Sequence, residues 1–293
     1  MKLGNYIKKL INSYRRNKRE FAFYLVLRAM VIVTCIRCLI TKNYESAAIC
    51  ILSLILFLIP AFLEDVLDLT IPPFFEAIIF AFIFAAEILG EINHYYVKIP
   101  GWDTILHTLN GFLFAAVGFS LIYLLNRGSK HFNVSPFYMA VVAFCFSMTI
   151  GVLWEFFECG MDLFLHLDMQ KDFIVRSFGT VTLDPNNAGT VIRVKDITDT
   201  VIHTASGQTY TIQGGYLDIG ILDTMKDLLV NLIGAVVFSI IGYISIKTDK
   251  KSKVAEALTI TPKDHEGDAE KEAEKDSKKN PEKDPEKDQS QKA

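Results

Sequence analysis

Acidic, imidazole and amide side chains recur at helical spacing in four apolar segments of this chain. Within each segment these residues lie three or four positions apart, so they share one face of a helix. Carboxylate oxygens and imidazole nitrogens bind Mg²⁺, Mn²⁺ or Zn²⁺, and such an ion can activate water or polarise a phosphate or carbonyl group. The four sets are Glu87, Glu91 and His94; Asp103, His107 and Asn110; Glu155, Glu158 and Asp162; and Asp223, Asp227 and Asn231.

These sets predict a metal site, although simpler roles stay open for some members. Asp103 and Asp223 stand where helical segments start, and there a carboxylate can cap backbone N–H groups. Glu91, His94 and Asp162 can face water, and Glu87 can be a hydrogen-bond donor between helices. A purely structural polar clamp is the alternative for the rest. The predicted ligands are His107, Glu155, Glu158, Asp227, Asp103, Asp162 and Asp223, with Glu87, Glu91 and Asn231 as further polar candidates.

The sequence lacks the motifs that would name a reaction or a catalytic residue. It has no nucleophile motif, no phosphate-binding loop and no His-Glu-x-x-His pair. Cys35-x-x-Cys38 has no second ligand pair, so the five cysteines are interpreted as small buried apolar residues. No basic surface with interleaved aromatic residues is present, which argues against nucleic acid as a partner.

Six segments are long and apolar enough to carry these residues through a membrane. A helix needs about 20 apolar residues to cross the hydrocarbon, where its backbone polar groups must be satisfied internally. The predicted fold is therefore an all-α integral membrane bundle of about six transmembrane helices. The segments are residues 21–41, 46–63, 74–92, 103–125, 136–159 and 224–246.

Lys and Arg residues predict the orientation of this bundle. Residues 1–20 contain seven of them, and the loop after the fourth segment contains Arg127 and Lys130. The short loops on the other side contain only Lys42 and Lys98. Because cytoplasmic loops carry an excess of Lys and Arg, both termini are expected in the cytoplasm.

This orientation brings the four polar sets to one level near the outer face. The third and fifth segments carry their acids near their ends, and the fourth and sixth carry theirs near their starts. At about 1.5 Å per residue, His107 and Asp227 lie roughly 6 Å below their helix starts. An ionised side chain in hydrocarbon costs roughly 2.5–3.5 kcal/mol. A divalent cation, shared protons or Arg37 of the first segment could compensate the charge.

The chain divides into membrane and soluble parts. Residues 1–20 form a basic cytoplasmic amphipathic segment, either a helix on the inner leaflet or a plain topology signal; residues 21–162 hold spans one to five, and residues 223–247 hold span six. Two pieces are predicted to be soluble. The tail of residues 248–293 repeats Pro-Glu-Lys-Asp and is expected to be a disordered cytoplasmic tail. Residues 163–222 are predicted to be an extracytoplasmic β-rich loop, either a cap over the bundle or a binding unit. Its expected strands are Thr180–Leu183, Val191–Val194, Val201–Thr204 and Thr209–Ile212.

Three short motifs in a fixed order carry a family resemblance. They are Trp102-Asp103-Thr104-Ile105-Leu106-His107-x3-Gly111-Phe112, Trp154-Glu155-x2-Glu158-x3-Asp162, and Asp223-Thr224-x2-Asp227-x3-Asn231-x2-Gly234-Ala235. Over residues 87–240 the chain resembles the YjdF-type group of bacterial inner-membrane proteins and, more distantly, the VanZ-like proteins, some of which are linked to glycopeptide resistance. The resemblance implies a multi-pass protein of the bacterial cytoplasmic membrane. The long insertion between Asp162 and Asp223 departs from that pattern.

Three functions are compatible with these observations. The first is a metal-dependent membrane enzyme that acts at the outer leaflet on a lipid head group or a lipid-linked envelope precursor. The second is a non-catalytic transporter or an envelope-stress or antibiotic-resistance factor, although carboxylates at one face do not make a complete proton path. The third is a structural polar clamp without activity.

Overall fold

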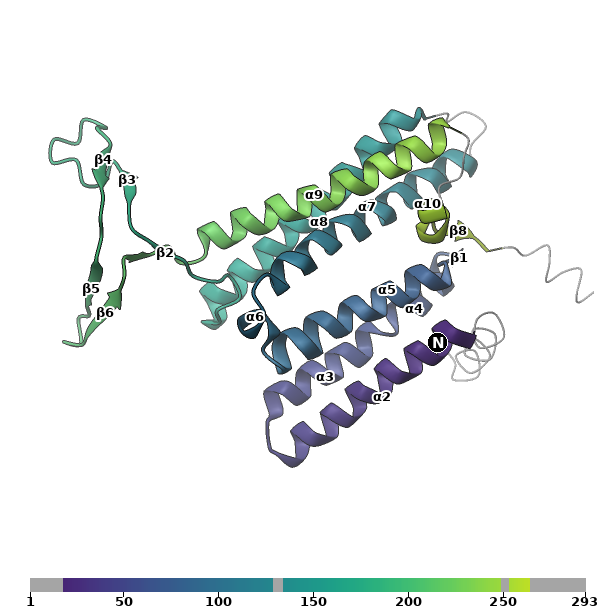
Figure 1. Cartoon of the computed structure of the whole chain (residues 1–293), viewed down its shortest axis with the longest axis horizontal. Coiled ribbons are helices and arrows are strands. Elements are labelled where there is room, and N and C mark those ends of the chain that lie inside the picture. The colour runs from purple at the N-terminus through teal and green to yellow at the C-terminus, as the bar shows by residue number, and fades with distance from the viewer. Residues whose placement is uncertain (1–17, 129–133, 249–252, 264–293) are drawn as a thin grey trace, which may run out of the picture.

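The computed structural model describes residues 18–128, 134–248 and 253–263, which form a bundle of long helices with a β-rich insertion at one end (Figure 1). Six helices in this part of the chain are long and apolar enough to cross a membrane, so the predicted all-α membrane bundle is confirmed. These helices are α2 (Lys18–Ile40), α3 (Tyr44–Leu56) continued by α4 (Ile59–Val66), α5 (Pro73–Ile83) continued by the π-helix η1 (Phe84–Ile92), α7 (Trp102–Gly128), α8 (Pro136–Leu165) and α9 (Ile221–Lys247).

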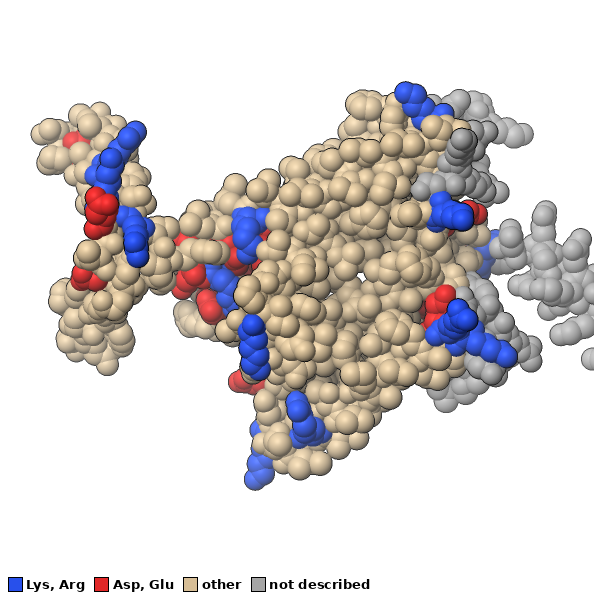
Figure 2. All heavy atoms as spheres, viewed as in Figure 1, with Lys and Arg blue, Asp and Glu red and all other residues tan. Residues whose placement is uncertain are grey.

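The outer surface of the bundle is apolar. Val33, Ile40 and Phe156 are 65%, 76% and 68% exposed, and many other large apolar side chains also point outward. Figure 2 shows an uncharged surface along the helices, with charged side chains gathered toward the two ends of the bundle. An apolar surface of this size is stable against lipid and not against water. The helices therefore contact the lipid bilayer.

The long helices form two groups (Figure 1). In the first, α2 packs on α3 and α5 around the rings of Tyr24, Phe57 and Phe80, whose centroids lie 4.6 to 6.2 Å apart. In the second, α7 packs on both α8 and α9. The short helix α6 (Tyr95–Lys98) links the groups, and the Trp102 indole of α7 donates to the Ala85 carbonyl of η1 at 3.2 Å. The site lies in the second group.

Two glycines bring α7 and α9 into backbone contact. A Cβ atom at Gly111 would lie 2.0 Å from the carbonyl oxygen of Asn231, and one at Gly234 would lie 2.0 Å from that of Thr108. Small residues allow this close approach, which membrane helices use because they lack a hydrophobic driving force. As a result, polar side chains on the neighbouring turns of α7 and α9 face each other at short range.

The β-rich insertion leaves the bundle between α8 and α9, at what we call the insertion end. Its strands pair antiparallel as β2 (Ile174–Val175) with β7 (Tyr216–Leu217), β3 (Phe178–Thr180) with β4 (Ile192–Val194), and β5 (Asp199–His203) with β6 (Thr209–Gln213).

Two expectations about this insertion are wrong. The expected strand Thr180–Leu183 stops at Thr180, because the chain turns there: the Thr182 N–H donates to the Thr180 hydroxyl and the Asp184 N–H donates to the Val181 carbonyl. The insertion also extends away from the helices instead of covering them as a cap (Figure 1).

The tail is not disordered from residue 248 onward as expected, because residues 253–263 are folded. They form α10 (Lys253–Leu258) and β8 (Thr261–Pro262), and β8 pairs antiparallel with β1 (Leu69–Thr70). Leu258 and Ile260 are buried, and the Ile260 N–H donates to the buried Ser120 hydroxyl at 3.0 Å. A segment this short carries too few apolar residues for its burial to be predicted from the sequence, because the burial depends on contacts with distant helices. The expectations for residues 1–17 and 264–293 lie outside the described residues.

We predict that Ile260→Asp releases this segment from the bundle. A buried unpaired carboxylate costs several kcal/mol, more than so short a segment can offset. Hydrogen exchange at residues 253–263 should accelerate at least about tenfold, since about 1.4 kcal/mol corresponds to a factor of ten. Val254→Asp is the matched control, because Val254 is 45% exposed. Equal exchange in the two variants would contradict the docked segment.

Candidate metal centre

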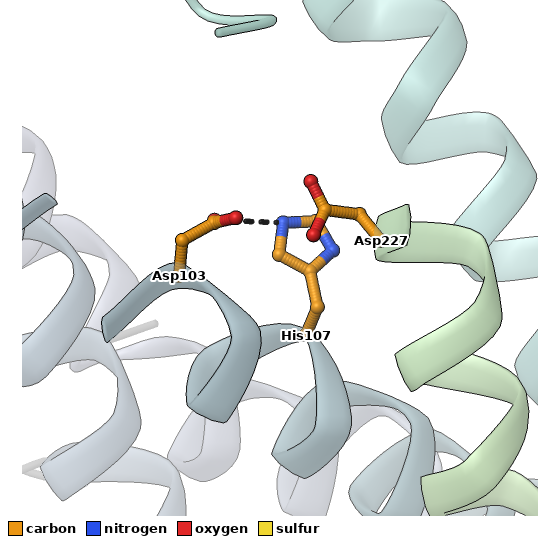
Figure 3. Close-up of side chains that lie close together, drawn as sticks. All are labelled: Asp103, His107 and Asp227. Carbon is orange, nitrogen blue, oxygen red and sulfur yellow. Dashed lines mark ion pairs between the residues drawn. The ribbon is translucent and has the colours of Figure 1, made fainter. Parts of the chain in front are cut away.

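His107 lies at the centre of the polar residues at the insertion end. Its Nε2 atom is 3.3 Å from Oδ1 of Asp103 on the same helix, and its Nδ1 atom is 3.8 Å from Oε1 of Glu155 on α8. Figure 3 shows the imidazole ring between the carboxylates of Asp103 and Asp227, which come from α7 and α9. The two ring nitrogens therefore face carboxylates from different helices.

Two groups of three side chains are close enough to hold a metal ion, and they share His107. The first is Asp103, His107 and Asp227, and the second is His107, Glu155 and Glu158. Within each group, one ligand atom from each residue lies within 4.8 Å of the others. Three helices thus bring five of the seven predicted ligands together.

Three carboxylates of this centre are deeply buried, and two of their oxygens lack a hydrogen-bond partner among the described residues. Glu155, Glu158 and Asp227 are 4%, 8% and 1% exposed. Oε1 of Glu158 accepts the Trp154 indole N–H at 2.8 Å. Oε2 of Glu155 and Oδ1 of Asp227 have no hydrogen-bond partner among the residues that the structure describes. Because an unsatisfied buried charge is costly, these oxygens favour a bound cation or a shared proton.

Lys226 is the residue that the sequence analysis missed. Its Nζ atom lies 2.8 Å from Oδ1 of Asp223, 3.2 Å from Oδ2 of Asp103 and 3.4 Å from Oδ1 of Asp227. It therefore supplies the compensating charge that the sequence analysis considered for Arg37. Lys226 stands three residues after Asp223, and this spacing places both side chains on one helix face. A lysine near a helix start usually faces solvent, so the spacing alone does not predict that Lys226 joins the centre.

A layer of neutral polar groups closes the centre toward the middle of the bundle. The Asn110 amide donates to Oδ1 of Asn231 at 3.2 Å, and the Ser147 hydroxyl donates to the Gly111 carbonyl at 2.7 Å. Below this layer lie the buried rings of Phe119 and Phe238. Asn231 therefore joins helices beneath the charged residues and is not one of the closely grouped ligands.

Asp162 and Asp223 anchor the start of the insertion. Oδ1 and Oδ2 of Asp162 accept the N–H groups of Met169 and Gln170 at 2.7 and 2.8 Å. Oδ2 of Asp223 accepts the N–H of Lys171 at 2.8 Å. Asp162 therefore stands outside the grouped ligands. Asp223 does not cap its own helix, whose N-cap residue is Gly220.

The predicted set of Glu87, Glu91 and His94 does not share one α-helical face. Glu87 and Glu91 lie on the π-helix η1, whose wider turns change the angular spacing of side chains. His94 lies beyond the end of that helix, where it has a left-handed backbone conformation with φ of 60° and is the N-cap residue of α6. Glu91 and His94 are exposed and Glu87 is half-buried, so none of the three joins the closely grouped ligands.

Tyr96 provides a neutral polar group beside the centre. Its ring packs on η1 so closely that a Cβ atom at Gly90 would lie 2.3 Å from Cε2. Burial raises the pKa of the Tyr96 phenol, and the negative charges of Glu91, Asp103, Glu87 and Glu158 raise it further. The phenol therefore stays protonated within electrostatic range of the acidic residues.

The fold and the centre together define a polytopic helical membrane protein with buried carboxylates and a histidine at one end. The chain belongs to the family described as "Predicted membrane protein (DUF2238)", whose model matches residues 22–188, more than half of the chain. The match includes Asp103, His107, Glu155 and Glu158, and it ends before α9. No curated protein and no solved structure matches the chain.

We predict that Gly234→Ala destabilises the bundle by about 1–3 kcal/mol, the usual cost of overpacking. The added methyl group would meet the Thr108 carbonyl and push α9 away from α7. Gly160→Ala is the control, because its Cβ atom would lie 4.0 Å from the nearest atom, in Phe164. Thermal unfolding in detergent should show a lower midpoint for Gly234→Ala only. A similar loss in both variants would contradict the close packing.

Proposed function

We propose that the chain is a metal-dependent membrane enzyme that acts at the outer leaflet of the bacterial cytoplasmic membrane on a lipid head group or a lipid-linked envelope precursor. The divalent ion, Mg²⁺, Mn²⁺ or Zn²⁺, is held by His107, Glu155 and Glu158. The observation that carries this proposal is the pair of buried carboxylates with the unpartnered oxygen Oε2 of Glu155.

Charge balance favours the group of His107, Glu155 and Glu158 as the metal ligands over the group of Asp103, His107 and Asp227. Lys226 already provides a positive charge near Asp103 and Asp227. Among the described residues, no Lys or Arg forms an ion pair with Glu155 or Glu158; Glu155 lies near His107, and Glu158 accepts the Trp154 indole N–H. A divalent cation at this position would neutralise both carboxylates.

The contacts of His107 suit this assignment. A neutral imidazole can give Nδ1 to the ion while its Nε2–H group points to the Asp103 carboxylate, 3.3 Å away. Such carboxylate–histidine–metal arrangements fix the tautomer and orient the ring. A bound ion would lower the pKa of a coordinated water or polarise a phosphate or carbonyl oxygen.

The surroundings of the centre favour a lipid substrate. Trp154, Phe156 and Phe157 flank the two glutamates on α8 and are 43%, 68% and 48% exposed on the outer surface of the bundle. His107 and Asp227 lie in the second turns of α7 and α9, close to the insertion end of the bundle. A lipid could therefore place its chains along α8 and its head group near the ion.

Two further considerations support the location. The Lys and Arg residues of residues 1–20 and of the loop after α7 favour a cytoplasmic position for both termini, which puts the insertion end outside. The resemblance to YjdF-type and VanZ-like proteins favours the bacterial cytoplasmic membrane and an envelope-linked substrate.

A structural polar clamp is a second candidate, and one observation favours it. His107 joins α7 to α8, and Lys226 joins α9 to α7, through ion pairs that require no metal. In that case the cluster would hold the helices in register, and it would bind no ion.

Metal analysis of the purified protein in detergent tests the proposed function. The wild type should hold about one divalent ion per chain, whereas His107→Ala and Glu155→Gln should lose it because each removes a ligand. Asp103→Asn should weaken metal binding about 10–100-fold, as changes behind a ligating histidine do. Glu91→Gln is the matched control, because Glu91 is an exposed carboxylate at the same end.

Activity and stability measurements then separate the candidates. Wild-type protein loaded with metal should release phosphate or another head-group product from lipid-linked phosphates, and a chelator should stop this reaction. A folded wild type without stoichiometric metal would rule out the enzyme. Variants that unfold while the wild type holds no metal would favour the clamp.

A further inference from the structure

Three carboxylates surround the ammonium group of Lys226. Oxygens of Asp223, Asp103 and Asp227 lie 2.8, 3.2 and 3.4 Å from Nζ, and they come from both α7 and α9. Asp223 and Asp227 are 3% and 1% exposed, whereas the Lys226 side chain is 36% exposed. The lysine therefore lies on the solvent side of two buried acids.

Carboxylate oxygens are donors that a divalent cation takes, and ligand atoms of Asp103 and Asp227 lie, with His107, within 4.8 Å of one another. Asp223 reaches the same ammonium group from the preceding turn of α9. Carboxylates from separate elements that converge on one point are typical ligands of Mg²⁺, Mn²⁺ and Zn²⁺, which bind oxygen at about 2.0–2.2 Å. Asp227 is 1% exposed. Its Oδ1 atom lies 3.4 Å from Nζ of Lys226, but it forms no hydrogen bond of good geometry with any described group. The ammonium group therefore satisfies this oxygen incompletely.

We propose that Lys226 occupies a second cation position, formed by Asp103, Asp223 and Asp227, and so limits the centre to a single divalent ion. The inference rests on the proposed function for the first ion, but the second position is defined by its own residues. Asp103 connects the two positions, since Oδ1 faces His107 and Oδ2 faces Lys226.

The consequence is chemical. A centre with two metal ions clamps both the attacking and the leaving oxygen of an in-line displacement. A centre with one ion and one ammonium group activates a single water or polarises a single oxygen, while the lysine offers a positive charge and N–H donors to an anionic substrate. The Phe173 ring lies beside this ammonium group, with its centroid 5.8 Å from Nζ.

The test replaces the lysine and counts bound Mn²⁺ in the full-length protein. Lys226→Met should raise the number of bound Mn²⁺ ions from about one to about two per chain, because three carboxylates lose their internal cation. Lys226→Arg keeps the charge and should bind as the wild type does. Lys171→Met is the control, because Lys171 is an exposed lysine at the same end whose ammonium group contacts only Asp168 among the described ion pairs.

Thermal unfolding keeps the test decisive if Lys226→Met is unstable. In a chelator this variant should unfold at a lower temperature than the wild type, and Mn²⁺ should restore the midpoint. If Lys226→Met unfolds at the same low temperature with and without Mn²⁺, the proposal is overturned, because an ion that fills the vacated position should stabilise the folded variant.

The outcomes separate this inference from the proposed function. If Lys226→Met holds the same number of ions as the wild type, the second position is refuted while the first stands. If the wild type holds none and Lys226→Met holds one, Lys226 does occupy a cation position and the first ion is refuted. If neither protein binds Mn²⁺, both proposals are wrong.

Discussion

The need to balance negative charge inside the apolar bundle governs the insertion end of this protein. Asp103, Glu155, Glu158, Asp223 and Asp227 lie close together, and all but Asp103 are less than a tenth exposed. In surroundings of low dielectric constant, such carboxylates repel each other strongly and lose their hydration. Each neighbouring feature supplies positive charge or N–H donors to them: the Lys226 ammonium group, the His107 ring, the Trp154 indole and the backbone N–H of Lys171.

This charge balance depends on how closely the helices pack. Gly111 and Gly234 let the backbones of α7 and α9 touch, and only then do Asp103 and Asp227 reach the same lysine and the same histidine. The layer of Asn110, Asn231 and Ser147 separates the charged groups from the apolar core below. The insertion is tied to the same place, because Asp162 and Asp223 bind its first residues. Packing, polarity and the insertion thus meet at one end of the bundle.

The two ends of the bundle differ in what holds them together. At the insertion end the contacts are ionic and polar, and two buried carboxylate oxygens there lack a hydrogen-bond partner among the described residues. At the other end, Leu258 and Ile260 of the tail pack against the apolar residues of α5 and α7. Among the described residues, Glu20 at the other end also has a buried oxygen without a hydrogen-bond partner, but only the insertion end groups several buried carboxylates around a histidine. This grouping is the physical basis for the proposed function.

Much of this arrangement could be predicted from residue types and spacing. Six apolar segments of sufficient length determine six helices, because a backbone in lipid must satisfy its own hydrogen bonds. The i, i+3 and i+4 spacing of Asp103 and His107, of Glu155 and Glu158, and of Asp223 and Asp227 determines that the members of each pair share a helix face. Both properties are local, so the sequence by itself settles them.

Other features were decided only by the tertiary structure. Lys226 near the start of α9 and Asp162 near the end of α8 both lie at the insertion end, yet Lys226 neutralises the carboxylates of the centre and Asp162 binds the insertion. Ile260 lies in a highly charged tail and is buried only because Ser120 and its apolar neighbours accept it. The set at Glu87 was misread because the π-helix changed its spacing. In each case the role depends on which distant residue comes within a few ångströms, and that distance is set by packing between helices and not by position along the chain.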